Sequence, residues 1–264
     1  MEPLSAFTEA ARREIRGVFA DIDETLTSDG RLTADAYGAL ERLKLAGLIC
    51  VPITGRPAGW CDHIARMWPV DAVVGENGAF YFRHDPESHV LQKRFLKSAA
   101  ERADDRHQLD KLCGRILAEV PGAAVASDQP YRDADLTIDF CEDVPSLPAE
   151  SIDRIVAIFR EGGATAKVSS IHVNGWFGNY DKLTMTRIAM DECFGIDLDA
   201  EKQHFVFIGD SPNDAPMFGY FPNAVGVANV HDFAGQLDAE PAYVTERRAG
   251  EGFAELAEAL LAVR

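Results

Sequence analysis

The chain has 264 residues, and its 43 acidic side chains outnumber 26 basic ones, which gives a formal net charge of -17. A hydrophobic fraction of 47% with 26% charged residues is typical of a globular protein and disfavours a disordered, collagen-like or coiled-coil chain. The negative charge argues against nucleic acid and anionic membranes as partners, because both would repel the chain. The length suits one large domain, or a core with a smaller second domain.

Three observations bear on the compartment. Residues 1–17 mix acidic and basic side chains without an apolar run, so we expect no secretory signal. No stretch reaches the roughly 18 apolar residues that a membrane span needs. The five cysteines are scattered and form no CxxC pair, which argues against a disulfide framework and a structural zinc site. These features predict a cytoplasmic protein with reduced thiols.

The first third of the chain alternates apolar runs with helical patterns. Short apolar runs at 15–20, 48–53 and 70–74 predict strands that are buried on both faces of a parallel sheet. Between the first two runs, Thr33 is expected to cap a helix that ends at Gly47. This order predicts an α/β core with a Rossmann-like, doubly wound parallel sheet.

The pattern changes after Phe82. Residues 83–97 are expected to be hairpin-like, and two helices are then expected, one ending at Pro121-Gly122 and one opening at Pro148. Alternation of polar and apolar residues predicts a strand at 134–140 with one face in solvent. Two more short strands are expected at 166–169 and 171–176.

We therefore predict an inserted α+β cap domain at 83–177, with 1–82 and 178–264 forming the core.

The last third returns to the first pattern of strands and helices. The expected strands are 205–208, 224–227 and 243–244, and the expected helices are 182–194, 214–220 and one that starts at Gly252. Pro52 lacks the backbone donor that a central strand needs, so we expect it to mark an early end of its strand.

Polar residues follow three of the expected core strands, in the segments 21–25, 54–56 and 209–214. The carboxyl ends of parallel strands meet at one edge of a sheet, so these segments can converge on one site. Clustered carboxylates repel each other unless a cation neutralises them, and oxygen ligands of this kind favour Mg²⁺ beside a phosphate. In such a site Asp21 could act as a nucleophile, and Asp23 as a general acid and base.

These segments resemble the four motifs of the haloacid dehalogenase (HAD) superfamily of phosphotransferases, in order and approximate spacing. Asp21-Ile22-Asp23-Glu24-Thr25 resembles the DxDxT motif, Thr54-Gly55-Arg56 the second motif, Lys182 the third, and Gly209-Asp210-Ser211-Pro212-Asn213-Asp214 the GDxxND fourth. The position and β/α content of the insert resemble the C2B cap of subfamily IIB. That subfamily includes Cof-type, sucrose-phosphate and mannosyl-3-phosphoglycerate phosphatases and phosphomannomutases.

The resemblance implies a role for each matching residue. Asp21 would be the nucleophile and Asp23 the general acid and base. Mg²⁺ would be bound by Asp21, the backbone carbonyl of Asp23 and Asp210, with Asp214 or Asn213 in support. The phosphate would be held by Thr54, Gly55 and Lys182.

Substrate contacts are expected from two places. Arg56, Glu76 and Asn77 lie just beyond core strands, where Asn77 is equally explained as a simple turn residue. His172, Asn174 and Trp176 alternate along an expected cap strand, so they would share one face. That face could bind a sugar by hydrogen bonds and ring stacking, or Trp176 could simply pack in the cap.

The leading hypothesis is a Mg²⁺-dependent phosphatase that hydrolyses a small phosphorylated metabolite through an aspartyl-phosphate intermediate. A sugar phosphate is the favoured substrate. A phosphosugar mutase of the phosphomannomutase type is the alternative within the same chemistry. A non-catalytic protein that binds a phosphorylated metabolite is an alternative of another class. We expect a monomer or homodimer with neither nucleic acid nor membrane as partner.

Overall fold

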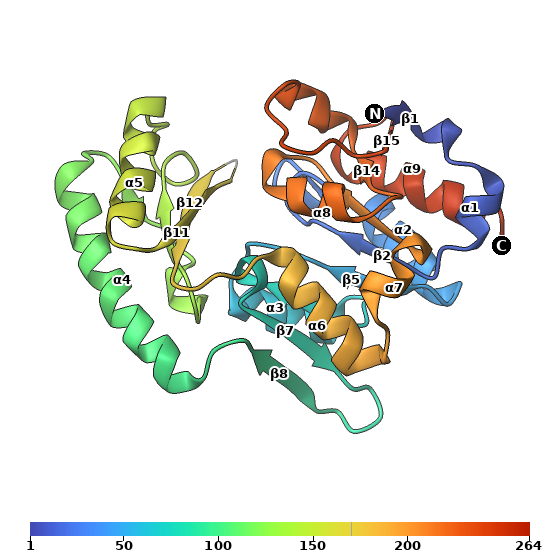
Figure 1. The fold of residues 1–264 in the computed structure, drawn as a ribbon, viewed down its shortest axis with the longest axis horizontal. Coiled ribbons are helices and arrows are strands. Elements are labelled where there is room, and N and C mark those ends of the chain that lie inside the picture. Colours follow the sequence, from blue (N-terminus) through green and yellow to red (C-terminus); the bar gives the residue numbers. More distant parts are fainter. Residues whose placement is uncertain (170) are drawn as a thin grey trace.

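The computed structural model describes residues 1–169 and 171–264, which build a large α/β core and a smaller sheet with two helices beside it (Figure 1). The core strands are β1 (Glu2–Pro3), β2 (Gly17–Ala20), β5 (Ile49–Pro52), β6 (Val73–Gly75), β7 (Phe80–His84), β8 (Leu91–Phe95), β13 (Phe205–Gly209), β14 (Val225–Gly226) and β15 (Tyr243–Val244). A small hairpin, β3 (Thr27–Ser28) and β4 (Arg31–Leu32), follows β2.

The core helices are α1 (Glu9–Arg13), α2 (Ala34–Leu45), α3 (Ala58–Met67), α6 (Lys182–Phe194), α7 (Leu198–Glu201), α8 (Ala215–Tyr220) and α9 (Ala249–Leu261). The smaller unit contains α4 (Ala99–Glu119), β9 (Ala124–Val125), β10 (Leu136–Asp139), α5 (Ala149–Glu161), β11 (Thr165–Val168) and β12 (His172–Trp176). We refer to this smaller unit, residues 98–176, as the cap.

The core sheet is parallel over six strands, in the order β1-β15-β14-β13-β2-β5. A parallel bridge between Ile53 and Val74 continues the sheet to β6, and β7 and β8 extend it antiparallel. The hairpin expected at 83–97 is therefore β7 and β8 at the edge of the core sheet, and the chain passes to the cap sheet only after Phe95.

Both faces of this sheet are buried. On β2, Val18 and Ala20 pack in one hydrophobic cluster with α2, α3 and α9, whereas Phe19 packs in a second cluster with α6 and α8. Successive side chains of a strand point to opposite faces, so this alternation means that helices cover both sides of the sheet. The predicted doubly wound α/β core is confirmed.

The cap has a sheet and a hydrophobic cluster of its own. Its antiparallel strands follow the order β11-β12-β10-β9. Leu136 and Ile138 of β10 pack with Ile116 of α4 and with Ile155 and Phe159 of α5. In Figure 1 these two helices cover the side of the cap sheet that is turned away from the core.

The prediction that one face of residues 134–140 is in solvent is wrong. Thr137 is 0% exposed and Asp139 is 1% exposed, and both lie on the sheet face opposite the cap helices. Alternation in a sequence shows that one face of a strand is polar, but not what covers that face. Here the polar face is covered by buried polar side chains and by the core.

The start of one helix and the position of one proline also have local explanations. α4 begins at Ala99, ten residues before the apolar stripe at Leu109, because Ser98 and Glu101 form a reciprocal capping box. Pro52 is the last residue of β5, as expected. On the edge of β5 that faces β6, the N–H of Cys50 donates to the Asp71 carboxylate and the N–H of Thr54 donates to the carbonyl oxygen of Val74. Of these three alternate positions, only Pro52 has no N–H to donate. Within the described residues, the helices are too short or too polar to serve as membrane spans.

Gly78 is a steric constraint between the sheet edge and α6. Its φ is +103°, and a Cβ built there would lie 2.0 Å from the backbone carbonyl oxygen of Asp181, so the backbone would have to shift. We expect Gly78→Ala to lower the free energy of unfolding in urea by about 2–4 kcal/mol. Gly47→Ala is the matched control, because φ is +83° and no atom lies within 4 Å. It should cost only about 1 kcal/mol of backbone strain. Equal losses in the two variants would contradict the steric explanation.

Candidate active site

The expected site residues lie at the carboxyl ends of neighbouring strands. Asp21 follows β2, and its N–H still donates to Ile208 of β13 at 2.9 Å. Thr54 follows β5, and its N–H donates to Val74 of β6 at 2.9 Å. Asp210 follows β13 directly. The last bonds of the sheet thus fix the three segments at one edge, as a parallel sheet predicts.

Lys182 reaches this edge from the first turn of α6. Asp181 caps that helix by accepting the N–H of Thr184 at 2.8 Å, which fixes the place where the helix starts. Lys182 Nζ lies 2.6 Å from Asp21 Oδ1 and 2.8 Å from Asp214 Oδ1. All three side chains are buried, so the ion pairs are shielded from water.

A fixed loop holds the carboxylate of Asp214. Its Oδ2 accepts the backbone N–H groups of Asp210 at 3.1 Å and of Ser211 at 3.4 Å. Thr25 Oγ1 lies 3.5 Å from Asp210 Oδ1, which connects the first motif to the fourth. Oxygen atoms of Asp21, Asp210 and Asp214 lie within 4.8 Å of one another.

The buried carboxylates of this cluster carry more negative charge than the one lysine can neutralise. Burial raises the pKa of Asp21 to about 7, Lys182 opposes this shift, and the charges of Asp214 and Asp23 add to it. Burial, followed by the charges of Asp214 and Asp21, raises the pKa of Asp210 well above its usual range. One lysine cannot neutralise three carboxylates. Their oxygen atoms and spacing fit a hard divalent cation, which would supply the missing positive charge.

The second motif is held rigidly beside the cluster. Thr54 is fully buried, and its Oγ1 accepts the N–H of Arg56 at 3.0 Å. Gly55 lies on the cavity wall, where a Cβ would lie 3.2 Å from the amide oxygen of Asn77. The buried side chain of Asn77 therefore packs against Gly55 from the neighbouring loop.

Asp23 has a different partner from Asp21. Arg56 binds both oxygens of its carboxylate, with Nε 3.0 and 3.1 Å from Oδ1 and Oδ2 and Nη2 2.8 Å from Oδ1. The guanidinium also lies over the ring of Trp60, 4.6 Å from the ring centre, and 3.7 Å from Glu142 of the cap. The carboxylate of Asp23 is thus directed to Arg56 and lies outside the cluster of three carboxylates.

A cavity of about 340 Å³ separates this edge of the core from the cap. Ten of the residues singled out from the sequence line this cavity: Asp21, Asp23, Gly55, Arg56, Asn77, His172, Asn174, Lys182, Asp210 and Asn213. Thr54 and Asp214 lie behind the wall and support it through the bonds given above. The motif residues of the core and the polar face of β12 therefore meet at one cavity.

Trp176 does not line this cavity. It is 1% exposed and its ring stacks on Tyr180 with centroids 5.7 Å apart, within the hydrophobic cluster of the core. Of the two explanations weighed for this residue, packing describes its position. It shares the strand face of His172 and Asn174, but it lies beyond the cavity, where the cap joins the core.

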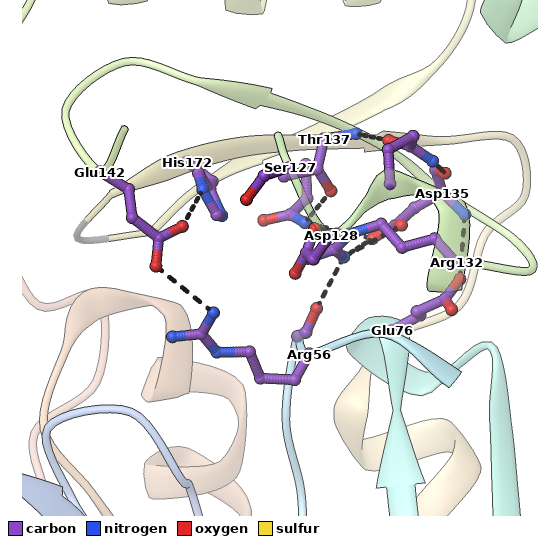
Figure 2. A network of polar contacts seen from close by, with 12 residues as sticks. Arg56, Glu76, Ser127, Asp128, Arg132, Asp135, Thr137, Glu142 and His172 are labelled. Carbon is purple, nitrogen blue, oxygen red and sulfur yellow. Dashed lines mark hydrogen bonds and ion pairs between the residues drawn. The ribbon is translucent and has the colours of Figure 1, made fainter. Parts of the chain in front are cut away.

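A buried network in the cap wall of the cavity does not follow from the sequence (Figure 2). The guanidinium of Arg132 binds Asp128 at 2.9 Å and Asp135 at 3.1 Å, and its Nη1 donates to the carbonyl oxygen of Gly55 at 2.9 Å. Asn174 donates to Asp135 at 3.2 Å and to Thr137 at 2.8 Å. A cap arginine thus fixes the peptide of the second motif. The polar half of the alternation at 134–140 was the one signal of this network in the sequence.

Glu76 of the core binds the cap segment 133–135 through hydrogen bonds. Its fully buried carboxylate accepts the N–H of Ala58 at 2.9 Å and those of three cap residues, Asp133, Ala134 and Asp135, at 2.6–3.1 Å. Burial, with a further contribution from the charge of Asp135, raises the pKa of Glu76 to about 7. Glu76 and Asn77 both have positive φ, 42° and 55°, so a strained turn places the carboxylate at this junction.

At the cavity wall, the buried His172 has its Nε2 2.8 Å from Glu142 Oε2 (Figure 2). Burial lowers the pKa of His172, against the opposing charge of Glu142. Glu142 thus connects a cap histidine to Arg56 and, through it, to Asp23.

The buried network should be far more important for stability than exposed networks of the same composition. Arg132→Met leaves Asp128 and Asp135 buried without a cation, so we expect it to lower the free energy of unfolding by about 3–5 kcal/mol. Arg154→Met is the matched control, because Arg154 also pairs with two carboxylates, Glu119 and Glu161, but in solvent. It should change stability little. Urea unfolding measures both, and similar small losses would contradict the assigned role of Arg132.

Cation binding at the carboxylate cluster can be measured without a substrate. We expect Mg²⁺ to raise the thermal unfolding midpoint of the protein, because a ligand present at about 100 times its dissociation constant stabilises a fold by about 2.7 kcal/mol. Asp210→Asn should weaken this response and should itself stabilise the metal-free protein, since it removes charge repulsion. Asp153→Asn, at an exposed position on α5, is the control for loss of one charge. An unchanged Mg²⁺ response in Asp210→Asn would contradict the site.

Comparison with known proteins supports the identification made from the motifs. The family model of haloacid dehalogenase-like hydrolases matches residues 18–113. A curated relative, phosphoglycolate phosphatase of Methanothrix thermoacetophila, is 28% identical over 247 residues, which cover 92% of this chain and 95% of the relative.

Solved structures with this fold include two phosphatases. Sucrose-phosphatase of Synechocystis sp., in complex with sucrose and phosphate, has a TM-score of 0.64 at 16% identity and covers 94% of this chain and 98% of that one. A HAD subclass IIB sugar phosphatase has a TM-score of 0.62 at 15% identity and covers 94% and 100%. Residues 18–113 are therefore similar in sequence to haloacid dehalogenase-like hydrolases, and the chain as a whole shares the fold of these solved structures.

Proposed function

We propose that the protein is a Mg²⁺-dependent phosphatase that hydrolyses a small phosphorylated metabolite through an aspartyl-phosphate at Asp21. The observation that carries the proposal is the pair of short contacts from Lys182 to Asp21 and Asp214 at the wall of the cavity. A protein that only bound the metabolite would have no need of a buried carboxylate held at a phosphate site. This arrangement therefore favours catalysis over binding.

In this proposal Asp21, Asp210 and the backbone carbonyl of Asp23 bind Mg²⁺, with Asp214 or Asn213 in support. The bound ion would keep the carboxylates ionised and neutralise charge on the phosphate oxygens. Thr54, the N–H of Gly55 and Lys182 would hold the remaining phosphate oxygens. The rigid second motif, fixed by Arg132, supports this role for Gly55 because the orientation of its peptide is set before substrate arrives.

The first chemical step forms the covalent intermediate. An oxygen of Asp21 attacks phosphorus, the bond from phosphorus to the ester oxygen breaks, and Asp23 gives a proton to the leaving oxygen. Arg56 binds both oxygens of Asp23, so the guanidinium must release one of them before Asp23 carries a proton. Glu142 and the ring of Trp60 offer the released guanidinium other partners.

The second step returns the enzyme to its starting state. Asp23 accepts a proton from water, the water oxygen bonds to phosphorus, and the bond from phosphorus to Asp21 breaks to release inorganic phosphate. The cap covers the site through Glu76 and Arg132, which would limit access of bulk water to the intermediate. The location in the cytoplasm and the state as monomer or homodimer stay predictions.

Two kinds of leaving group are candidates. The sequence pattern favours a sugar, and a sugar is named for both solved phosphatases with this fold. The curated relative is a phosphoglycolate phosphatase, whose substrate carries a carboxylate. A phosphosugar mutase would use the same intermediate but pass the phosphoryl group to a second hydroxyl. Stoichiometric release of inorganic phosphate from a metabolite ester favours hydrolysis over that alternative.

Burst kinetics test the roles of the two aspartates. With p-nitrophenyl phosphate, whose leaving group needs no acid, Asp23→Asn should release about one equivalent of nitrophenolate quickly and then turn over slowly. The slow phase is expected because the variant lacks the base that activates water. Asp21→Asn should show neither phase, with activity reduced by about a thousandfold or more.

Two control measurements test for the effect of losing one charge and for metal dependence. Asp153→Asn should show wild-type kinetics, and EDTA should abolish turnover in the wild type. A burst in Asp21→Asn, or full steady-state activity in Asp23→Asn, would contradict the proposed division of roles.

A further inference from the structure

We propose that Lys167 binds a negatively charged group of the leaving group, so that the substrate is a phosphate ester of a hydroxy acid and not of a neutral sugar. This inference rests on the proposed phosphatase function and specifies its substrate class. It follows from the partners of the cations that face the cavity and from the position of Lys167 on the cap sheet.

Four cationic side chains among the described residues line the cavity: Arg56, Arg132, Lys167 and Lys182. Three of them are already paired. Arg56 binds Asp23, Arg132 binds Asp128 and Asp135, and Lys182 binds Asp21 and Asp214. Lys167 forms no ion pair with a carboxylate of the described residues, so its charge is available to a ligand.

The register of the cap sheet directs Lys167 toward the cavity. It pairs with Asn174 across β11 and β12, and directly paired residues of neighbouring strands project from the same face of a sheet. Asn174 lines the cavity, and so does His172, two residues away on the same strand. Lys167 is therefore an exposed residue on the polar face of the cap sheet, and it lines the same cavity as Asp21 and Lys182.

The carboxylates on that face do not compete for the lysine. Asp135 is bound by Arg132 and Asn174, and Asp139 accepts the N–H groups of Cys141, Glu142 and Asp143 at 2.8–2.9 Å. Glu142 is occupied by His172 and Arg56. A chain with a net charge of -17 repels anions in general, so a substrate with both a phosphate and a carboxylate needs a cation at each end. Lys182 and Lys167 supply that pair.

A lysine at this position also has a second explanation. β11 is an edge strand of the cap sheet, and lysines on edge strands prevent pairing with other chains. That role would be independent of the substrate. The two explanations differ in one measurable quantity, the preference of the enzyme for an acidic over a neutral leaving group.

Two matched pairs of esters isolate the carboxylate. They are 2-phosphoglycolate with 2-hydroxyethyl phosphate, and 3-phosphoglycerate with glycerol 3-phosphate. Within each pair a carboxylate replaces a hydroxymethyl group on the same chain. We expect the wild type to have the higher kcat/KM for the acidic member of at least one pair. Lys167→Met should reduce that preference by about tenfold to a hundredfold, since hydrogen bonds to charged groups have this strength.

Two variants control for structure and charge. Lys167→Arg keeps the charge and should keep most of the preference. Lys111→Met removes the same charge from an exposed position on α4 of the cap and should leave the preference unchanged. Thermal unfolding midpoints of all variants establish that the cap remains folded.

The outcomes separate this inference from the proposed function. If the wild type releases no phosphate from these esters or from p-nitrophenyl phosphate, the phosphatase function itself fails. If the wild type is active but prefers the neutral esters, or accepts only p-nitrophenyl phosphate, the role of Lys167 is wrong. An equal preference in the wild type and Lys167→Met would also overturn it and would favour the role of an edge-strand lysine.

Discussion

Burial of three carboxylates against one lysine at the end of a parallel sheet is the constraint on which the rest of this structure depends. Asp21, Asp210 and Asp214 come from two neighbouring strand ends, and Lys182 enters from a helix more than 150 residues after Asp21 in the chain. Such a cluster is unstable as a set of bare anions, and burial raises the pKa of Asp21 and Asp210 accordingly. The fold keeps these residues together because the last bonds of the sheet leave each loop little freedom, and a bound cation would relieve their repulsion.

The cap is joined to this site by a second set of buried charges. Glu76 accepts N–H groups from the cap segment 133–135, and Arg132 of that segment holds the carbonyl oxygen of Gly55. The loop of Thr54 and Gly55, where we propose that the phosphate binds, is therefore shaped partly by the cap. A third connection, from His172 through Glu142 to Arg56, ends at Asp23. Movement of the cap would act on both this loop and Asp23, and would therefore affect the two places where we propose phosphate binding and proton transfer.

The sequence predicts those parts of the molecule that depend on local pattern. The helix at 182–194 and the strand at 243–244 have the predicted bounds, because apolar period and capping residues are local properties. The convergence of Asp21, Gly55, Lys182 and Asp210 follows from the topology of a parallel sheet. The network around Arg132 could not be predicted in this way, since its partners depend on how the cap docks. For the same reason the sequence does not show that the polar face at 134–140 is covered, or that the ring of Trp176 packs on Tyr180.

We propose that Asp21 carries the phosphoryl group during turnover. This can be measured by rapid acid quenching of the enzyme in the steady state with Mg²⁺ and a metabolite ester, followed by proteolysis and mass spectrometry. We expect one added phosphoryl group on the peptide that contains Asp21, located at that residue and removed by hydroxylamine, which cleaves acyl phosphates. Steady turnover with no modified peptide, or with the phosphoryl group on another side chain, would contradict it.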